Sequence, residues 1–393
     1  MRICFISTYP PIECGIGTYT EYLADALTQQ NNEVMVLAEY GSKGDRVFPV
    51  YSRDDHDIAA KLFSMVNKLS PEVIHIQHEY GLFNHLSGVQ IVDFIIQCKM
   101  HGIPVITTLH TVMTVPPEYL KAEKILLENI FFNGSGVIVH EINQREALKG
   151  MFGYNANVSR IPHGVRDIKY PPGIKAKTKK LLGLEDKKIL LLIGYLRDTK
   201  GLHKIVEVFP QIADKIENAV LLIASKVQGY EINNYTESFF KRIEDSPVED
   251  KIHVLSGQFP QFTFDRILNA ADVVALPYDL GGQSGIMAHA AAFHVPVVTS
   301  NLISFVLWNE ETKGGLIAHN HQDYVTHICK ILSDDTYAGS IRENIKKSNE
   351  SRLWSEIARQ HLSIYQKVMN FPYKKAKYVY IAEEEFNRDH DGS

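Results

Sequence analysis

The chain has 393 residues, of which 45% are hydrophobic and 22% are charged, and its formal net charge is -5. The length favours two domains over one, and the acidic balance excludes a broad basic surface for nucleic acid. No apolar run reaches the roughly 18 residues that a membrane span needs, and the first residues lack the long apolar core of a secretion signal, so we expect a cytoplasmic protein. Weak attachment to a membrane surface stays open, although no basic amphipathic helix stands out. The sequence specifies no oligomeric state.

Short apolar strands alternate with amphipathic helices along the first half of the chain. Strands are predicted over residues 2–7, 33–39, 73–79, 104–110, 136–140 and 158–165. Helices are predicted from near Thr18 to residue 30 and over residues 57–69, 89–100 and 119–132. This alternation indicates a parallel sheet that is covered by helices on both faces.

The same alternation restarts after a segment that is rich in lysine and proline, which indicates a linker that leads into a short helix. Strands are predicted over residues 189–196, 219–225, 251–257, 272–278 and 296–300, and helices over residues 201–216, 262–271, 285–294 and 351–370. We therefore expect these parts: an N-terminal domain (1–170), a linker (171–188), a C-terminal domain (189–350), a helix that packs back on the first domain (351–372) and a mobile tail (373–393). Ligands of such sheets bind beyond the carboxyl ends of the strands, which favours a site in a cleft between the domains.

Glycines and polar residues follow the predicted strands of the first half. Gly15 and Gly17 precede a helix N-terminus, which suits close approach to an anion, although the loop lacks the GxGxxG spacing of a nicotinamide site. A tightly packed turn explains these glycines equally well. His78 and Glu79 end one strand and His110 follows the next, so each side chain can face a ligand.

Each of these residues also has a simpler structural interpretation. His78 and Glu79 also fit a solvated loop end, and a lone histidine such as His110 is more often a hydrogen-bonded structural residue. His163, followed by Gly164, fits a turn at the domain edge, with contact to a substrate as the alternative.

Two loops of the second half suit phosphate. Gly194 ends a strand, and Arg197 and Lys200 follow before a helix, where two cations would offset the charge of a pyrophosphate. Two unrelated surface cations are the alternative. The stretch GGQSG, residues 281–285, precedes another helix, so its backbone N–H groups and the Ser284 hydroxyl can point at a phosphate.

The chain resembles the retaining glycosyltransferases of the GT-B fold, the group that includes glycosyltransferase family 4. The resemblance covers nearly all of residues 1–370 and rests on the ordered stretches PPIECGIGTYT, VIHIQHEYG, TTLHTV, RIPHGV, GYLRDTKGL and LPYDLGGQSGIMAHAAAFHVPVV. The similarity is greatest to a mannosyltransferase-like subgroup that has QSG in place of the usual glutamate motif.

The resemblance implies an α/β protein with two Rossmann-like domains that face each other across a cleft. It places Gly15 and Gly17 near the donor phosphates and the reacting sugar, His110 beside the transferred sugar, and Lys200 on the donor pyrophosphate. The backbone under the phosphates would come from Gln283, Ser284 and Gly285.

The chain departs from the family pattern at several positions. Tyr195 stands where the family often has an arginine, and Arg197 would supply that charge instead. Gly281 and His289 stand where the family has two glutamates, the first near the sugar and the second on the nucleotide ribose.

The resulting expectation is a retaining hexosyltransferase that needs neither a cofactor nor a metal. GDP-mannose is the favoured donor, UDP-glucose and UDP-N-acetylglucosamine are the alternatives, and the acceptor would be a glycan or a glycolipid. Two other functions stay open, namely a nucleotide-sugar 2-epimerase that uses Glu79 as its carboxylate and a non-catalytic scaffold that the missing glutamates favour.

Overall fold

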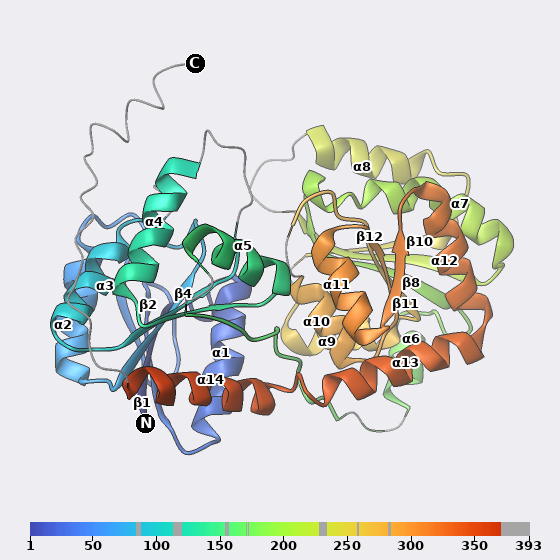
Figure 1. Cartoon of the computed structure of the whole chain (residues 1–393). Coiled ribbons are helices and arrows are strands. Elements are labelled where there is room, and N and C mark those ends of the chain that lie inside the picture. The colour runs from blue at the N-terminus through green and yellow to red at the C-terminus, as the bar shows by residue number, and fades with distance from the viewer. Residues whose placement is uncertain are drawn as a thin grey trace. The chain divides into compact units, whose positions relative to one another are not determined.

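The computed structural model describes residues 1–83, 88–112, 120–153, 157–169, 171, 173–227, 234–257, 259–281 and 284–370, without the side chains of 120–124 and 227. The tail expected over 373–393 lies outside these residues. The chain divides into unit 1, Met1–Gly164 together with the chain from Trp354, and unit 2, Val165–Leu353 (Figure 1). No helix within the described ranges is long and apolar enough to cross a membrane.

Unit 1 is built on a sheet of parallel strands in the order β3-β2-β1-β4-β5-β6-β7. The strands are β1 (Arg2–Ser7), β2 (Glu33–Glu39), β3 (Val47–Tyr51), β4 (Val73–His78), β5 (Val105–Leu109), β6 (Gly136–Val139) and β7 (Val158–Arg160). Its helices are α1 (Gly15–Thr28), α2 (Ile58–Leu69), α3 (Ile91–Met100), α4 (Leu120–Asn133), α5 (Ile142–Phe152) and α14 (Trp354–Met369).

Alternate residues of β1 separate two apolar layers in unit 1. Ile3 and Phe5 are buried in the cluster that includes residues of α1 and α14, whereas Cys4 and Ile6 belong to the cluster with residues of α2, α3 and α4. Helices α1 and α14 contact each other, although the sequence between them is most of the chain (Figure 1). The last described helix is thus an integral part of the layer that covers unit 1.

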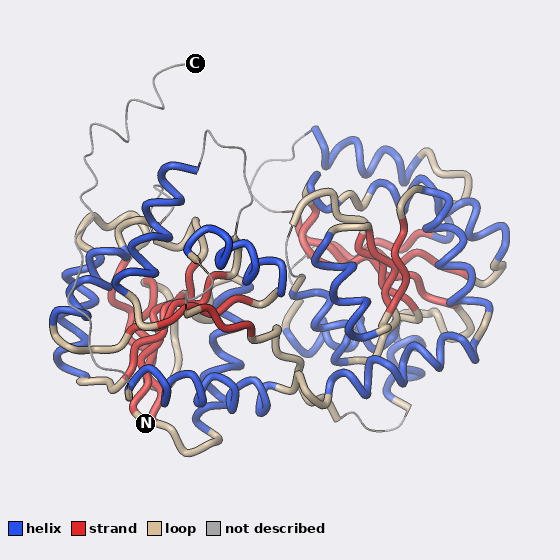
Figure 2. Tube along the Cα trace, viewed as in Figure 1, coloured by secondary structure: helices blue, strands red, loops and turns tan. Residues whose placement is uncertain are grey.

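Unit 2 has a second parallel sheet in the order β10-β9-β8-β11-β12-β13. Its strands are β8 (Lys188–Leu196), β9 (Ala219–Val227), β10 (Ile252–Ser256), β11 (Val273–Leu276), β12 (Val297–Ser300) and β13 (Gly315–Ala318). Its helices are α6 (Ile174–Leu181), α7 (His203–Lys215), α8 (Asn234–Glu244), α9 (Gln261–Ala270), α10 (Gly285–Ala292), α11 (Ile303–Thr312), α12 (His321–Ser333) and α13 (Asp335–Asn349). Helices flank the strands in each unit (Figure 2), which confirms the predicted α/β class with two Rossmann-like units.

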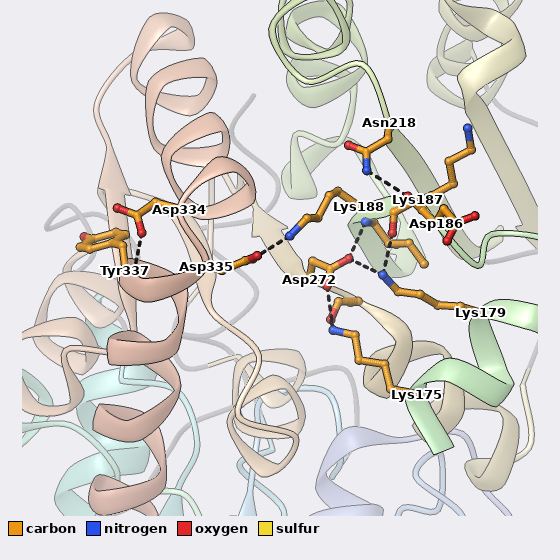
Figure 3. A network of polar contacts seen from close by, with 12 residues as sticks. Lys175, Lys179, Asp186, Lys187, Lys188, Asn218, Asp272, Asp334, Asp335 and Tyr337 are labelled. Atoms are coloured by element: carbon orange, nitrogen blue, oxygen red, sulfur yellow. Dashed lines mark hydrogen bonds and ion pairs between the residues drawn. The ribbon is translucent and has the colours of Figure 1, made fainter. Parts of the chain in front are cut away.

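The segment expected to be a linker contains α6, which packs against α9 in unit 2. The ammonium groups of Lys175 and Lys179 each lie 2.8 Å from the carboxylate of Asp272, which also accepts a 2.8 Å bond from the backbone N–H of Ile189 (Figure 3). Burial raises the pKa of Asp272, but the two lysines and this amide outweigh it, so the net pKa lies below its usual range.

The division between the units falls after Gly164, earlier than residue 170.

Two predicted boundaries in unit 1 differ from the structure. Helix α1 begins at Gly15 and not near Thr18, so Gly15 and Gly17 lie in its first turn. The strand expected over residues 158–165 ends at Arg160 because Pro162 has no backbone N–H to continue the ladder.

Candidate active site

In unit 2 the loops that follow β8 and β11 meet at the carboxyl edge of the sheet. The two strands are neighbours, and the chain leaves β8 toward β9 but leaves β11 toward β12, so this edge is the point where the strand order reverses. Gly194 has φ +120°, and a Cβ on it would lie 3.6 Å from Cγ1 of Ile286 in α10. Gly201 has φ +58°, and a Cβ there would collide with the carbonyl oxygen of Pro277. Gly194 thus lies inside β8, two residues before its end, and beside the start of α10, whereas Gly201 lets the loop after β8 pass against the loop after β11.

Lys200 and Ser284 both contact one tyrosine, Tyr278. Lys200 ends a short 3₁₀ helix, Asp198–Lys200, and its Nζ lies 3.6 Å from the centroid of the Tyr278 ring. The Tyr278 hydroxyl is 3.4 Å from Oγ of Ser284. The structure thus brings together the lysine loop and the serine loop that the sequence marked separately.

Lys200 is a cation for which the described part of the chain offers no ion-pair partner. Burial removes water from its ammonium group and the positive charge of Arg197 adds repulsion, which together lower the pKa of Lys200 to about 8. Among the described residues, the ion pairs do not include Lys200, whereas Lys204 in the same region pairs with Asp279. The exposed Arg197 guanidinium lies 5.7 Å from the ring centroid of Tyr195, the residue in the family's arginine position. A bound anion would supply the missing negative charge.

The N-terminus of α10 opens onto the same region. Ser284 is its N-cap residue, is 6% exposed and makes no side-chain capping bond, and a Cβ on Gly285 would meet no atom within 4 Å. The amides of a first helical turn have no intrahelical acceptor, so this end of α10 can donate to an anion. Gln283 lies outside the described residues.

His289, in the family's ribose position, lies on α10 and is held by neighbouring side chains. Its Nδ1 accepts from the guanidinium of Arg166 at 3.3 Å, and its ring packs edge-on against Phe264. Arg166 in turn makes a two-point ion pair with Asp265.

In unit 1 four histidines occupy the carboxyl ends of four neighbouring strands. They are His78, His110, His140 and His163, from β4, β5, β6 and β7. Three of them surround Tyr19 of α1, whose ring centroid is 4.9 Å from that of His110 and 5.2 Å from those of His140 and His163. Trp354 of α14 completes the ring of contacts at 4.9 Å.

His110 is partly exposed and is held by several hydrogen bonds. Its Nε2 lies 2.9 Å from the side-chain amide of Gln77, its Nδ1 lies 3.3 Å from Nε2 of His140, and its backbone N–H donates to the carbonyl of His78. Burial, and then the neighbouring histidines, hold the pKa of His110 well below its usual value. At neutral pH the ring is uncharged, so it can orient a hydroxyl group but cannot act as a cation.

The remaining predicted residues of unit 1 fall into two groups. Glu79 lies beside the His110 loop, because its carboxylate accepts a 2.7 Å bond from the hydroxyl of Thr111. His78 is the last residue of β4, is only 1% exposed, and stacks on Phe83. His78 is thus packed within the sheet layer rather than placed on a loop.

The two glycines of the first loop also differ from each other. A Cβ on Gly15 would meet no atom within 4 Å, whereas a Cβ on Gly17 would lie 3.3 Å from the backbone of Tyr9. His163 donates from Nδ1 to the carbonyl of Gly164 at 2.8 Å. Gly15 can therefore approach a ligand, while Gly17 serves packing.

Four residues of these sites were not predicted from the sequence, namely Tyr19, Gln77, His140 and Tyr278. His140 follows β6 and could have been found by the rule that selected His110. The other three carry no signal of their own, since a tyrosine or glutamine becomes informative only when its neighbours are known. Within the described ranges, His, Cys, Asp and Glu side chains form no group of three or more that could hold a metal ion.

Comparisons with known proteins extend this picture. The model of Glycosyltransferase Family 4 matches residues 14–167, and that of Glycosyl transferases group 1 matches residues 174–350. An uncharacterized glycosyltransferase of Methanocaldococcus jannaschii is 26% identical over 94% of this chain and 99% of its own length. Spore coat protein SA of Bacillus subtilis is 29% identical over 47% of this chain, and the match spans 50% of that protein.

The solved structures agree in fold. Anabaena HepE in complex with UDP has a TM-score of 0.74 at 15% sequence identity, over 93% of this chain and 100% of HepE. Together with the two family models, which succeed each other between residues 14 and 350, this likeness places the chain among the glycosyltransferase family 4-like proteins of the GT-B fold.

Proposed function

We propose that the protein is a retaining glycosyltransferase that moves a sugar from a nucleotide-diphosphate sugar to a glycan or glycolipid. The observation that carries the proposal is the half-buried ammonium group of Lys200, which pairs with no described carboxylate, beside the N-terminus of α10. A pyrophosphate is the anion that this pair suits, because it accepts both a charge-assisted bond and backbone N–H bonds.

The proposed reaction breaks the bond between sugar C1 and the donor phosphate oxygen. The acceptor oxygen forms its bond to C1 on the same face, and its proton passes to the departing phosphate oxygen. Lys200 and the amides near Gly285 stabilise the charge that develops on the leaving group, which is the largest contribution that such a site can make. His110, neutral at physiological pH, orients the sugar hydroxyls.

The donor proposed first is GDP-mannose, which rests on the resemblance of the QSG form to the mannosyltransferase-like subgroup. UDP-glucose is its main competitor, since HepE structures of the same fold contain UDP and UDP-glucose. Thermal-shift titrations with GDP, UDP and ADP, followed by turnover of the matching nucleotide sugar, separate these donors, because a ligand stabilises the fold by mass action.

The Lys200→Met variant tests the site itself. We expect it to lose the nucleotide-dependent shift, while Lys241→Met, which removes an exposed lysine of α8, keeps it. Equal shifts in both variants and the wild type would contradict the placement of the pyrophosphate.

A non-catalytic scaffold is the second candidate. Gly281 and His289 favour this function because they replace the two family carboxylates. In addition, Nδ1 of His289 contacts the guanidinium of Arg166. A protein that none of the three nucleotides stabilises would support the scaffold and overturn the transferase. The third candidate is a 2-epimerase that uses Glu79 as its carboxylate. It can be tested separately, because that enzyme would release an epimerised sugar without any acceptor.

A further inference from the structure

A continuous series of polar contacts links α14 to His110 inside unit 1. It comprises five side chains, which we call the His110 chain: Tyr365, His75, Gln77, His110 and His140. The Tyr365 hydroxyl is 2.6 Å from Nδ1 of His75, and the contacts from Gln77 to His110 and from His110 to His140 measure 2.9 and 3.3 Å. Gln77 is also 3.4 Å from Nε2 of His75.

One end of the His110 chain has a fixed proton. Nδ1 of His140 lies 2.9 Å from the carbonyl oxygen of Ile161, and a carbonyl can only accept, so Nδ1 carries hydrogen. A neutral imidazole has one N–H, so Nε2 of His140 must then accept. The atom that faces it, Nδ1 of His110, therefore donates.

We propose that His140 is a positioning residue that holds His110 in the tautomer with its proton on Nδ1 and its lone pair on Nε2. The remaining contacts of the chain follow from this assignment. In the structure Oε1 of Gln77 faces Nε2 of His110 and the NH₂ group of Gln77 faces His75, so the assignment requires the amide to turn over and exchange these two atoms, which is a choice to be made from the hydrogen-bond network.

The other contacts of the His110 chain are compatible with this assignment of donors and acceptors. Nε2 of His75 then donates to the hydroxyl of Thr108 at 2.7 Å, and Nδ1 of His75 accepts from Tyr365. Burial raises the pKa of Tyr365 well above its usual value, so its hydroxyl keeps the proton that this bond needs. Every contact has one donor and one acceptor, and each histidine has one proton.

The opposite assignment, in which His140 donates to His110, requires a positively charged His140 ring. If Nε2 of His140 donated to His110, His140 would carry two protons, next to His163 and Arg160. Burial and these neighbours, against the opposing bond to Ile161, lower the pKa of His140 to about 3. The doubly protonated form is therefore a small minority at neutral pH.

The consequence for catalysis rests on the proposed function. With its lone pair on Nε2, His110 can accept a hydrogen bond from a sugar hydroxyl but cannot donate one to a sugar oxygen. An entering hydroxyl would share this atom with the Gln77 amide or displace it. Because Tyr365 lies on α14, the same order reaches from the C-terminal helix to the candidate site.

Nitrogen-15 NMR of the full chain labelled at its histidines tests the assignment without any donor or acceptor. Two-bond correlations from the hydrogens on the ring carbons to the ring nitrogens distinguish the two tautomers, and the His110 signal is identified by its loss in His110→Asn. We expect the wild type to show His110 protonated at Nδ1. Protonation at Nε2 would overturn the proposal.

Two variants separate positioning from general structural damage. His140→Phe keeps a ring against Tyr19 but removes the acceptor, so we expect His110 to shift to a mixture of tautomers and kcat to fall about tenfold or more, with the donor KM changed less than twofold. An unchanged His110 tautomer in His140→Phe would overturn the role of His140.

Tyr365→Phe, which removes only a hydroxyl, should move the His75 signal and leave His110 protonated at Nδ1. A change of the His110 tautomer together with the His75 signal would contradict control by His140. A wild type that has the expected tautomer but binds no nucleotide would refute the proposed function and leave this inference intact.

Discussion

At the scale of single residues, Lys200 predicts how donor binding depends on pH. The free protein loses the Lys200 proton as pH rises through about 8, whereas a bound pyrophosphate stabilises the protonated form. Donor affinity should thus be constant below this pH and fall by up to about tenfold per pH unit above it. Calorimetric titration with an intact nucleotide sugar, whose diphosphate does not titrate in this range, measures the profile.

The matched variant is Lys200→Arg, since the guanidinium keeps its proton throughout. It should bind with a flat profile up to about pH 9.5, whatever its absolute affinity. A wild-type profile as flat as that of the variant would exclude Lys200 as the titrating contact.

His110 makes a second prediction. Replacing it by alanine removes a polar group beside the reacting sugar, and we expect a loss of about 2–4 kcal/mol of transition-state stabilisation, measured as kcat/KM. His101→Ala, which removes an exposed histidine at the end of α3, is the control and should be close to wild type. Turnover at the wild-type rate by His110→Ala would show that the ring has no part in the reaction.

Much of this residue-level pattern could be predicted from sequence, because parallel strands end at one edge. His110, Lys200 and Ser284 were all selected by their place at the end of a predicted strand or after it. Tyr278 could not be, since it joins Lys200 to Ser284 only after β8 and β11 become neighbours. The tautomer of His110 likewise depends on residues that the fold brings together.

At the scale of elements, α6 predicts a difference between a buried and an exposed carboxylate. Asp272 is 9% exposed and pairs with Lys175 and Lys179 of α6, so Asp272→Asn should lower the free energy of unfolding by about 3 kcal/mol. Asp335→Asn breaks the exposed pair with Lys188 (Figure 3) and should change it by less than about 0.5 kcal/mol. Urea denaturation of both variants measures this, and equal effects would contradict the anchoring role of Asp272.

Several elements were not predicted, for different physical reasons. β3 contains Pro49, which argues against a strand, yet the edge of a sheet tolerates it. α8 could have been predicted, because Tyr235, Phe239 and Ile243 recur at helical spacing and pack in the core of unit 2. α12 could have been predicted, because Tyr324, Val325, Ile328, Ile331 and Leu332 recur at helical spacing and are all buried. The other elements missed were α5, α11, α13 and β13.

At the scale of the whole molecule, the two units supply different chemistry. Unit 2 offers the ammonium group of Lys200, which has no ion-pair partner among the described residues, and the N-terminus of α10. Unit 1 offers the neutral histidines His110 and His140. If Lys200 and the α10 amides offset the leaving-group charge, turnover should be the same in EDTA as in Mg²⁺, within about twofold. Activity that EDTA abolishes and Mg²⁺ restores would show that a metal ion carries this charge instead.

The most direct test is a crystal structure of the protein soaked with the nucleoside diphosphate that stabilises it. We predict phosphate oxygens within hydrogen-bond distance of Nζ of Lys200 and of the first amides of α10, between the loops that follow β8 and β11. A diphosphate bound elsewhere, with Lys200 still against Tyr278 and no anion near Gly285, would contradict the account.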